Sequence, residues 1–193
     1  MDFDKNKIQE LLDESSAKVE AIMKDTAALE NILQSAEQKL KDIPGVGQYA
    51  AKLPLMLSMI RSYIAKEYTE VSPKVVVSMV GALVYMLKGK DLIPDKIPVI
   101  GAVDDLAVLG LALQLNTAEL EAYKIGEALK KARKEQNLTQ KKLGEMVGVK
   151  EAQISKIENG KSVAFTTIIR LFKALGAKTA SLDLGNMGRV ALW

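Results

Sequence analysis

The sequence has no cysteine and no histidine among its 193 residues. The lack of cysteine excludes disulfides, thiolate metal ligands and a cysteine nucleophile, and the lack of histidine excludes imidazole ligands and the usual proton shuttle near pH 7. Zinc hydrolases and histidine-dependent triads are therefore excluded. What remains is binding, or catalysis by carboxylates, Lys, Ser, Thr and Tyr alone. We predict a binding protein that is not an enzyme and uses no cofactor or metal.

Apolar segments long enough to span a membrane are also missing. The longest apolar run, residues 75–87, has 13 residues, short of the roughly 20 that a bilayer requires, and a second run at 106–115 is shorter. The first six residues carry acids and lack the layout of a secretory signal. We expect a cytoplasmic protein, without membrane association, that buries both runs as core helices. A shallow membrane hairpin formed by the two runs is the alternative.

The formal net charge of the whole chain is only +3, but its C-terminal third is strongly basic. Residues 1–121 hold 13 Lys and Arg against 18 Asp and Glu, a net charge of −5, whereas residues 122–193 hold 14 against 6, a net charge of +8. Such asymmetry indicates that one end of the chain meets a polyanion. The 48% of hydrophobic residues is typical of a folded protein, here of two small domains.

Apolar positions within residues 8–40 alternate in steps of four and three, which is the spacing of a heptad seam. This predicts one long amphipathic helix in residues 1–42, packed either against the next helices or in a free-standing coiled coil. Pro44 and the glycines after it end this helix. Helical spacing resumes at 53–68, and Ser72-Pro73 opens the apolar helix that follows.

A turn rich in proline and acidic residues lies between the two apolar runs. It contains Asp91-Leu92-Ile93-Pro94-Asp95, Ile97-Pro98, Gly101 and Asp104-Asp105. This motif resembles that of the YkvA-like domain, a family of small bacterial domains of unknown function. The resemblance extends over residues 43–123, which we expect to form a helical domain. Lys88-Gly89-Lys90 departs from the Ser-Pro-hydrophobic sequence common in the family, so the local turn is expected to differ.

Four carboxylates lie close together in this turn. They are Asp91, Asp95, Asp104 and Asp105. Oxygen ligands of this kind bind Mg²⁺ or Ca²⁺. We favour helix capping, because Asp104 precedes a helix that begins near Leu106 and Asp105 lies in its first turn, where free N–H groups and the helix dipole favour acids. A metal-binding or enzymatic domain targeted to DNA is the alternative.

Four amphipathic helices are predicted in tight succession within residues 124–176. Their expected ranges are 125–136, 140–147, 150–159 and 165–175. Thr139 offers a hydroxyl that caps the second helix, and Gly148 suits the left-handed conformation that ends it. Two short helices joined across Gly148-Val149 form a helix-turn-helix, whose second helix fits a major groove about 12 Å wide.

The third helix of this segment divides into two faces. At about 100° per residue, Ile154 and Ile157 share the inner face, whereas the outer face carries short or polar residues. A recognition helix needs this division. The stretch from Leu138 to Lys161 resembles the Cro and lambda-repressor type of helix-turn-helix, with the pattern L-T-Q-x-x-L-A-x-x-x-G-V-S-x-x-x-I-S-x-I-E-N-G-K.

The resemblance implies three groups of functional residues. The residues that would read base edges are Glu151, Ala152, Gln153, Ser155 and Lys156. The residues that would contact phosphates are Thr139, Gln140, Lys150, Asn159 and Lys161. Arg133 and Glu158 would form a partly buried ion pair that ties the first helix to the third. In the major groove, Lys156 can donate to guanine, Glu151 can accept from cytosine N4, and Ala152 can touch a thymine methyl.

Two positions depart from the family pattern. Lys150 stands where relatives place a capping Ser or Thr. The third helix therefore loses on the order of 1 kcal/mol of stabilisation by a capping hydrogen bond, offset by attraction to a phosphate. Gly144 replaces the usual Ala, which keeps the helices close but weakens local helicity by up to about 1 kcal/mol.

Residues 177–193 change to a period of two and predict a strand, a turn and a second strand. A lone hairpin is barely stable in water, so we expect it to pair with its copy in a second subunit. Trp193 would be an interface or core anchor.

The predicted fold is mainly α: a helical N-terminal domain, a four- to five-helix lambda-repressor-like DNA-binding domain and a short C-terminal hairpin. The predicted function is sequence-specific binding of double-stranded DNA by a homodimeric transcriptional regulator, most simply a repressor. An antitoxin that binds a toxin and represses its own operon is the alternative.

Overall fold

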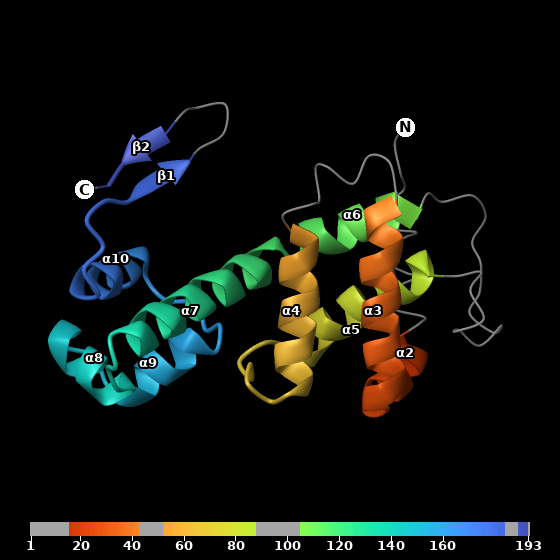
Figure 1. The fold of residues 1–193 in the computed structure, drawn as a ribbon, viewed down its shortest axis with the longest axis horizontal. Helices are drawn as coiled ribbons and strands as arrows, with labels where there is room; N and C mark the ends of the chain where they lie inside the picture. The colour runs from red at the N-terminus through yellow and green to blue at the C-terminus, as the bar shows by residue number, and fades with distance from the viewer. Residues whose placement is uncertain (1–15, 43–51, 88–104, 184–188, 193) are drawn as a thin grey trace. The chain divides into compact units, whose positions relative to one another are not determined.

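The computed structural model describes residues 16–42, 52–87, 105–183 and 189–192. The described chain is mainly helical and ends in a two-stranded antiparallel sheet (Figure 1), which confirms the predicted fold class. It divides into two compact units, Met1–Glu121 and Ala122–Trp193.

The N-terminal unit is built around an apolar helix. Its helices are α2 (Ser16–Lys24), α3 (Thr26–Asp42), α4 (Lys52–Ile64), α5 (Pro73–Met86), α6 (Asp105–Leu115) and the start of α7 (Thr117–Glu135). Helix α5 contacts α2, α3, α4 and α6, and most of its side chains are buried. The prediction that the apolar run 75–87 forms a core helix is confirmed. Ser72 is extended and Pro73 opens the helix, where the missing N–H of proline costs nothing.

The predicted single helix through residues 8–40 is wrong where the structure describes it. Helix α2 ends at Lys24 and α3 begins at Thr26. The carboxylate of Asp25 accepts hydrogen bonds from the backbone N–H groups of Ala27 and Ala28, each at 3.0 Å. These bonds cap α3, so the chain turns at Asp25 and both short helices pack against α5.

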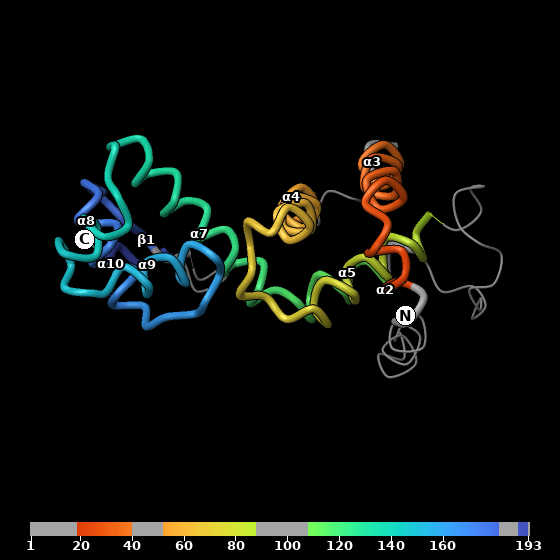
Figure 2. The backbone as a smooth tube through the Cα atoms, turned by 90° about the horizontal axis from the view of Figure 1, so that it is seen from below, coloured from red at the N-terminus to blue at the C-terminus, as the bar shows by residue number. Residues whose placement is uncertain are grey.

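Helices α3 and α4 have similar axis directions in both views (Figures 1 and 2). Arg61 near the end of α4 donates to Glu30 near the start of α3, with 3.2 Å between Nη2 and Oε1, so the helices are antiparallel. The same guanidinium donates to Glu37. Burial lowers the pKa of Arg61, but the hydrogen bonds to both glutamates outweigh it and raise the pKa overall.

Within the described ranges, none of the helices combines the length and the apolar character needed to cross a membrane.

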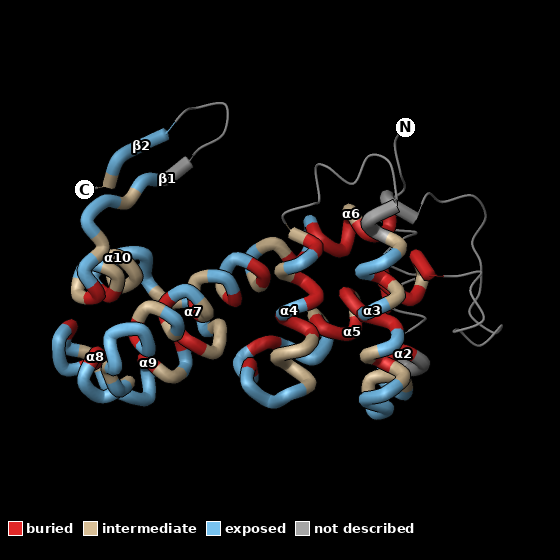
Figure 3. The backbone as a smooth tube through the Cα atoms, in the orientation of Figure 1, coloured by how far each residue is buried: buried red, intermediate tan, exposed pale blue. Residues whose placement is uncertain are grey.

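The C-terminal unit packs four helices around one core. It contains the remainder of α7 followed by α8 (Gln140–Val147), α9 (Glu151–Glu158), α10 (Phe165–Ala174), β1 (Ser181–Asp183) and β2 (Arg189–Ala191). The core residues, coloured as buried in Figure 3, come from the helices and the residue that follows α10: Leu129, Leu143, Val147, Ile154, Ile157, Leu171 and Leu175. Helices α8, α9 and α10 begin and end within one residue of the predicted positions.

Helix α7 begins eight residues before the predicted start at Ile125. The sequence from Thr117 to Lys124 contains no helix breaker, and Leu120 and Tyr123 are buried, so packing extends the helix. The turn at Asn116 precedes it: the buried amide of Asn116 donates to the carbonyl of Ala112 at 2.8 Å and to the hydroxyl of Ser78 at 2.9 Å.

The C-terminal hairpin pairs β1 with β2 in antiparallel register, with Ser181 opposite Ala191 and Asp183 opposite Arg189. All three residues of β2 are exposed.

Candidate nucleic-acid interface

The helix-turn-helix is fixed at its first helix by two local signals. The hydroxyl of Thr139 accepts a hydrogen bond from the backbone N–H of Lys142 at 3.1 Å, which caps α8 as the sequence predicts. Gly148 ends α8 in the left-handed region, with φ 71°, and the N–H of Val149 bonds to the carbonyl of Gly144 at 2.9 Å. The turn therefore leads directly into α9.

Helix α9 has the predicted buried and exposed faces. Ile154 and Ile157 are 0% and 3% exposed and anchor the helix in the core. Four of the five residues expected to read bases are exposed and the fifth is half-buried; the exposed ones are Glu151, Ala152, Gln153 and Lys156, and the half-buried one is Ser155. The outer surface of α9 is thus free to contact a ligand.

Lys150 occupies the capping position of α9 with extended backbone angles, and its side chain makes no capping hydrogen bond. The structure therefore confirms that α9 lacks the side-chain cap that a Ser or Thr would provide. Lys150 is exposed at the start of α9, the end of the helix at which the helix dipole is positive.

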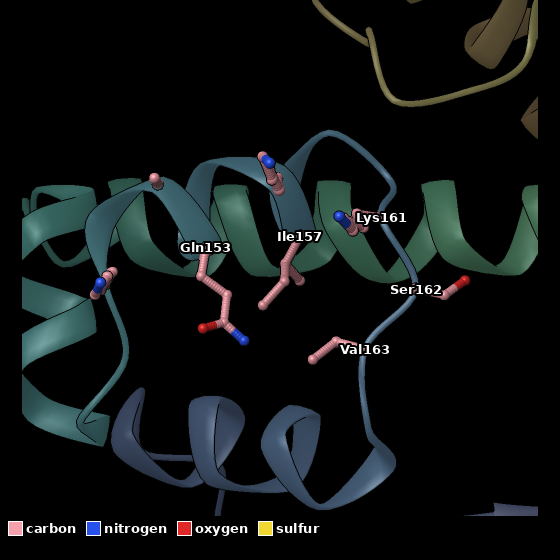
Figure 4. Close-up of a pocket in the computed structure, with 8 residues that line it drawn as sticks. Gln153, Ile157, Lys161, Ser162 and Val163 are labelled. Carbon is pink, nitrogen blue, oxygen red and sulfur yellow. The ribbon is translucent and has the colours of Figure 1, made fainter.

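An open groove of about 330 Å³ runs between α9 and the segment that follows it. Figure 4 shows Gln153, Ile157 and Val163 pointing into this hollow. The exposed lysines that line it are Lys150, Lys156 and Lys161. The groove thus combines an apolar floor of Ile157 and Val163 with three cations on its rim, a suitable environment for a sugar-phosphate backbone.

The structure brings Arg133 and Glu158 together in a bidentate ion pair. The Nε and Nη2 atoms of Arg133 donate to the two carboxylate oxygens of Glu158 at 2.6 and 2.8 Å, and Nη1 donates to the carbonyl of Leu138 at 2.7 Å. Both residues are buried. The hydrogen bonds to Glu158 raise the pKa of Arg133 against the opposing effect of burial. The pair joins α7 to the end of α9.

Two predicted phosphate ligands make hydrogen bonds inside the protein. The amide of Gln140 donates to Glu158 Oε2 at 2.8 Å, and the amide of Asn159 donates to the carbonyl of Ser155 at 2.7 Å. Each amide nitrogen carries a second hydrogen, so these bonds orient the side chains and leave one donor each for a ligand.

Close backbone contacts at two glycines hold α9 at both ends. A Cβ atom on Gly126 of α7 would lie 2.8 Å from the carbonyl oxygens of Ile157 and Glu158, and one on Gly144 of α8 would lie 2.5 Å from the carbonyl oxygen of Val149. Real Cβ atoms do not approach this closely, so only glycine fits without movement. The sequence predicts the close contact at Gly144 but gives no sign of the one at Gly126.

Two polar side chains that tie α10 to the other helices were also missed. Arg170 donates to the carbonyl of Val147 at the end of α8, and Gln136 donates to the carbonyl of Leu175 at 2.6 Å. Their signal in the sequence is weak, because polar residues on amphipathic helices are usually solvated.

The acidic cluster falls almost entirely outside the described residues: Asp91, Asp95 and Asp104 are not described, and Asp105 is described only as the first residue of α6. Among the described residues, no group of three or more acidic side chains is arranged to hold a metal ion.

Comparison with known proteins identifies two segments. Residues 129–182 match a family described as "Helix-turn-helix", and residues 75–111 match one described as "Protein of unknown function (DUF1232)". A relative named "Uncharacterized membrane protein YkvA", from Bacillus subtilis strain 168, is 35% identical over 65 residues, which are 34% of this chain and 61% of that protein. No solved structure matches the chain.

Proposed function

Because the chain joins a helix-turn-helix domain of the Cro and lambda-repressor type to a DUF1232 domain, we propose that it is a transcriptional regulator that binds specific double-stranded DNA sequences as a homodimer and acts as a repressor. The observation that carries the proposal is the division of α9, whose inner isoleucines are buried while its outer residues are exposed beside a lysine-rimmed groove. A helix held in this way can enter a major groove with a fixed orientation.

We assign base reading to the outer face of α9. Glu151 and Ala152 lie in its first turn, and Lys156 lies on the next turn of the same exposed surface. An ammonium group suits guanine O6 and N7, a carboxylate suits cytosine N4, and a methyl group suits thymine. Gln153 and Ser155 flank this surface and would contact the adjoining base edges or sugars.

Phosphate binding falls to residues on both sides of this surface. Lys150 and Lys161 lie on the groove, and Thr139 and Gln140 lie at the beginning of α8. Gln140 donates a hydrogen bond to Glu158, the last residue of α9, which also accepts from Arg133. A phosphate held by Gln140 would therefore be linked through hydrogen bonds to α9. Asn159 would bind a phosphate at the opposite end of α9.

Homodimerisation would place two copies of α9 about 34 Å apart on a pseudo-palindromic site. The hairpin β1–β2 supports a second copy as partner, since two-stranded sheets are marginal alone and the exposed Val190 of β2 offers apolar surface.

The test is selection of bound sequences from randomised duplex oligonucleotides with the full-length protein. We expect a two-fold-related motif for the wild type. Lys156→Ala should flatten the preference at one base pair per half-site, whereas Gln140→Ala should weaken binding to all sequences more evenly. Failure of the wild type to enrich any sequence in selection or gel-shift assays would refute the proposal.

A second candidate function is attachment of the DUF1232 region to a membrane. It is favoured by the name of the Bacillus relative, which describes that protein as a membrane protein. Against it, the apolar side chains of α5 are buried within its own unit. Flotation with liposomes distinguishes the two: a regulator that works without lipid stays at the bottom of the gradient.

A further inference from the structure

The end of α8 is held by a side chain from outside the helix-turn-helix. The carbonyl of Gly144 accepts the N–H groups of Gly148 and Val149. The neighbouring carbonyl of Val147 accepts a hydrogen bond from the guanidinium group of Arg170 on α10. A cation at this place satisfies a terminal carbonyl and lies at the negative end of the helix dipole.

This bond fixes the place from which the recognition helix starts. Only Gly148, Val149 and Lys150 separate Val147 from the first residue of α9, and Gly148 has little stiffness of its own because it lacks a side chain. A Cβ atom on Gly148 would lie 3.7 Å from Arg170 Nη2, so the guanidinium group lies directly beside the turn. The first turn of α9 therefore depends for its position on Arg170 as well as on the close contact of Gly144 with Val149.

The other end of α9 is held independently. Gly126 brings α7 against the carbonyls of Ile157 and Glu158, and Arg133 binds the carboxylate of Glu158. Loss of Arg170 would leave these contacts in place. The displacement of α9 caused by loss of Arg170 should therefore be greatest at the first turn of the helix and smallest at its last.

We propose that Arg170 is a positioning residue that sets the first turn of α9 and thereby the discrimination among base pairs that face Glu151 and Ala152. The inference rests on the proposed function. It assigns a role in specificity to a residue of α10 that reads no base itself, and it predicts that specificity is lost at some positions of the site but not at others.

Gln136 provides a matched control. Its amide donates to the carbonyl of Leu175 at 2.6 Å and so ties the end of α10 to the end of α7. Like Arg170 it donates to a backbone carbonyl, but that carbonyl lies after α10 and not at the end of α8.

The experiment measures position-resolved base preferences of the full-length protein by selection from randomised duplexes. The variants are Arg170→Met, Arg170→Lys and Gln136→Met. Arg170→Met should reduce discrimination roughly tenfold at the base pairs facing Glu151 and Ala152, with the preference at Lys156 kept. Arg170→Lys, which can still donate to the carbonyl of Val147, should restore the wild-type base preferences. Gln136→Met should leave these preferences unchanged even where it lowers the melting temperature as much as Arg170→Met does.

Several results would overturn the inference. An unchanged profile in Arg170→Met would do so, as would a uniform loss at every position together with a fall of about one in the salt slope, which marks a direct phosphate contact. If thermal melts show that Arg170→Met does not fold, Arg170→Gln is judged by the same criteria. A wild-type protein with no sequence preference refutes the proposed function itself, which separates the two failures.

Discussion

The ion pair between Arg133 and Glu158 is the most deeply buried charged contact among the described residues, with side chains 10% and 2% exposed. We predict that Arg133→Ala lowers the free energy of unfolding of the C-terminal unit by about 3–5 kcal/mol, because it leaves the Glu158 carboxylate buried without its cation. Denaturant unfolding followed by circular dichroism measures this loss.

Arg61→Ala, measured in the same way on the unfolding of the N-terminal unit, is the control. Arg61 also binds two glutamates, but its side chain and theirs are 35%, 41% and 49% exposed, so its loss should cost no more than about 1 kcal/mol. Equal losses for Arg133→Ala and Arg61→Ala would contradict the importance assigned to burial.

The contact at Gly126 gives a second prediction at the scale of single residues. Gly126→Ala should destabilise the protein, because crowding against the carbonyls of Ile157 and Glu158 costs about 1–3 kcal/mol, more than the roughly 1 kcal/mol that alanine gains in a helix. Ala128→Ser, on the exposed face of the same helix, should change the melting temperature little. A higher melting temperature for Gly126→Ala would show that α9 can move away at no cost.

The residues of the candidate site differ in how far the sequence could predict them. The pairing of Arg133 with Glu158 was implied by the motif match. The roles of Gly126 and Arg170 could not be predicted in this way. They depend on which backbone carbonyls the packed helices bring near these residues, and no local sequence pattern indicates those contacts. For the same reason, the bond between Gln140 and Glu158 was not anticipated.

At the scale of elements, helix limits were predictable where local chemistry sets them. Thr139 and Gly148 determine the ends of α8 through a cap and a left-handed turn. The turn at Asp25 was missed because its carboxylate lies within an apolar repeat that continues on both sides. The early start of α7 was missed because burial of Leu120 and Tyr123, rather than a start signal, supports its first turns.

The uncapped start of α9 leads to a prediction for that helix. Lys150→Thr should stabilise the protein by about 1 kcal/mol, because the extended backbone at this position suits a capping hydroxyl. The same change should weaken DNA binding and lower the salt slope by about 0.9, the value for one lost phosphate contact. Thermal melts and binding titrations at several salt concentrations measure the two effects.

Lys178→Thr serves as the control, since Lys178 is exposed and lies outside the helices and strands. It should leave both the stability and the salt slope close to those of the wild type. If Lys150→Thr gained stability with an unchanged slope, Lys150 would cap poorly but bind no phosphate.

At the scale of the whole molecule, the charge is divided between the two units, with a net −5 over residues 1–121 and +8 over 122–193. The positive charge is thus concentrated in the unit that contains the match to the helix-turn-helix family, as expected for a domain that contacts the polyanion DNA. In the N-terminal unit, the described hydrogen bonds of Arg61 and Asn116 join its own helices to one another.

The hairpin gives a prediction about assembly. Deletion of residues 181–193 should convert a dimer into a monomer and weaken binding to a two-fold site by roughly 10²–10⁴-fold, because the second half-site then no longer benefits from a linked partner. Sedimentation velocity measures the mass and gel shifts measure the affinity.

Val190→Lys is the milder variant, since it places a charge on the exposed apolar surface of β2 without shortening the chain. It should weaken the dimer in the same direction. A truncated protein that still sediments as a dimer would assign the interface to another surface.

Helix α7 has a practical consequence for genetic dissection. The border between the two compact units falls between Glu121 and Ala122, inside a helix that runs unbroken from Thr117 to Glu135. Any gene fragment cut at that border would start or stop in mid-helix and fray there. A fragment intended to retain DNA binding should therefore keep codons from Thr117 onward, so that Gly126 lies within a complete helix.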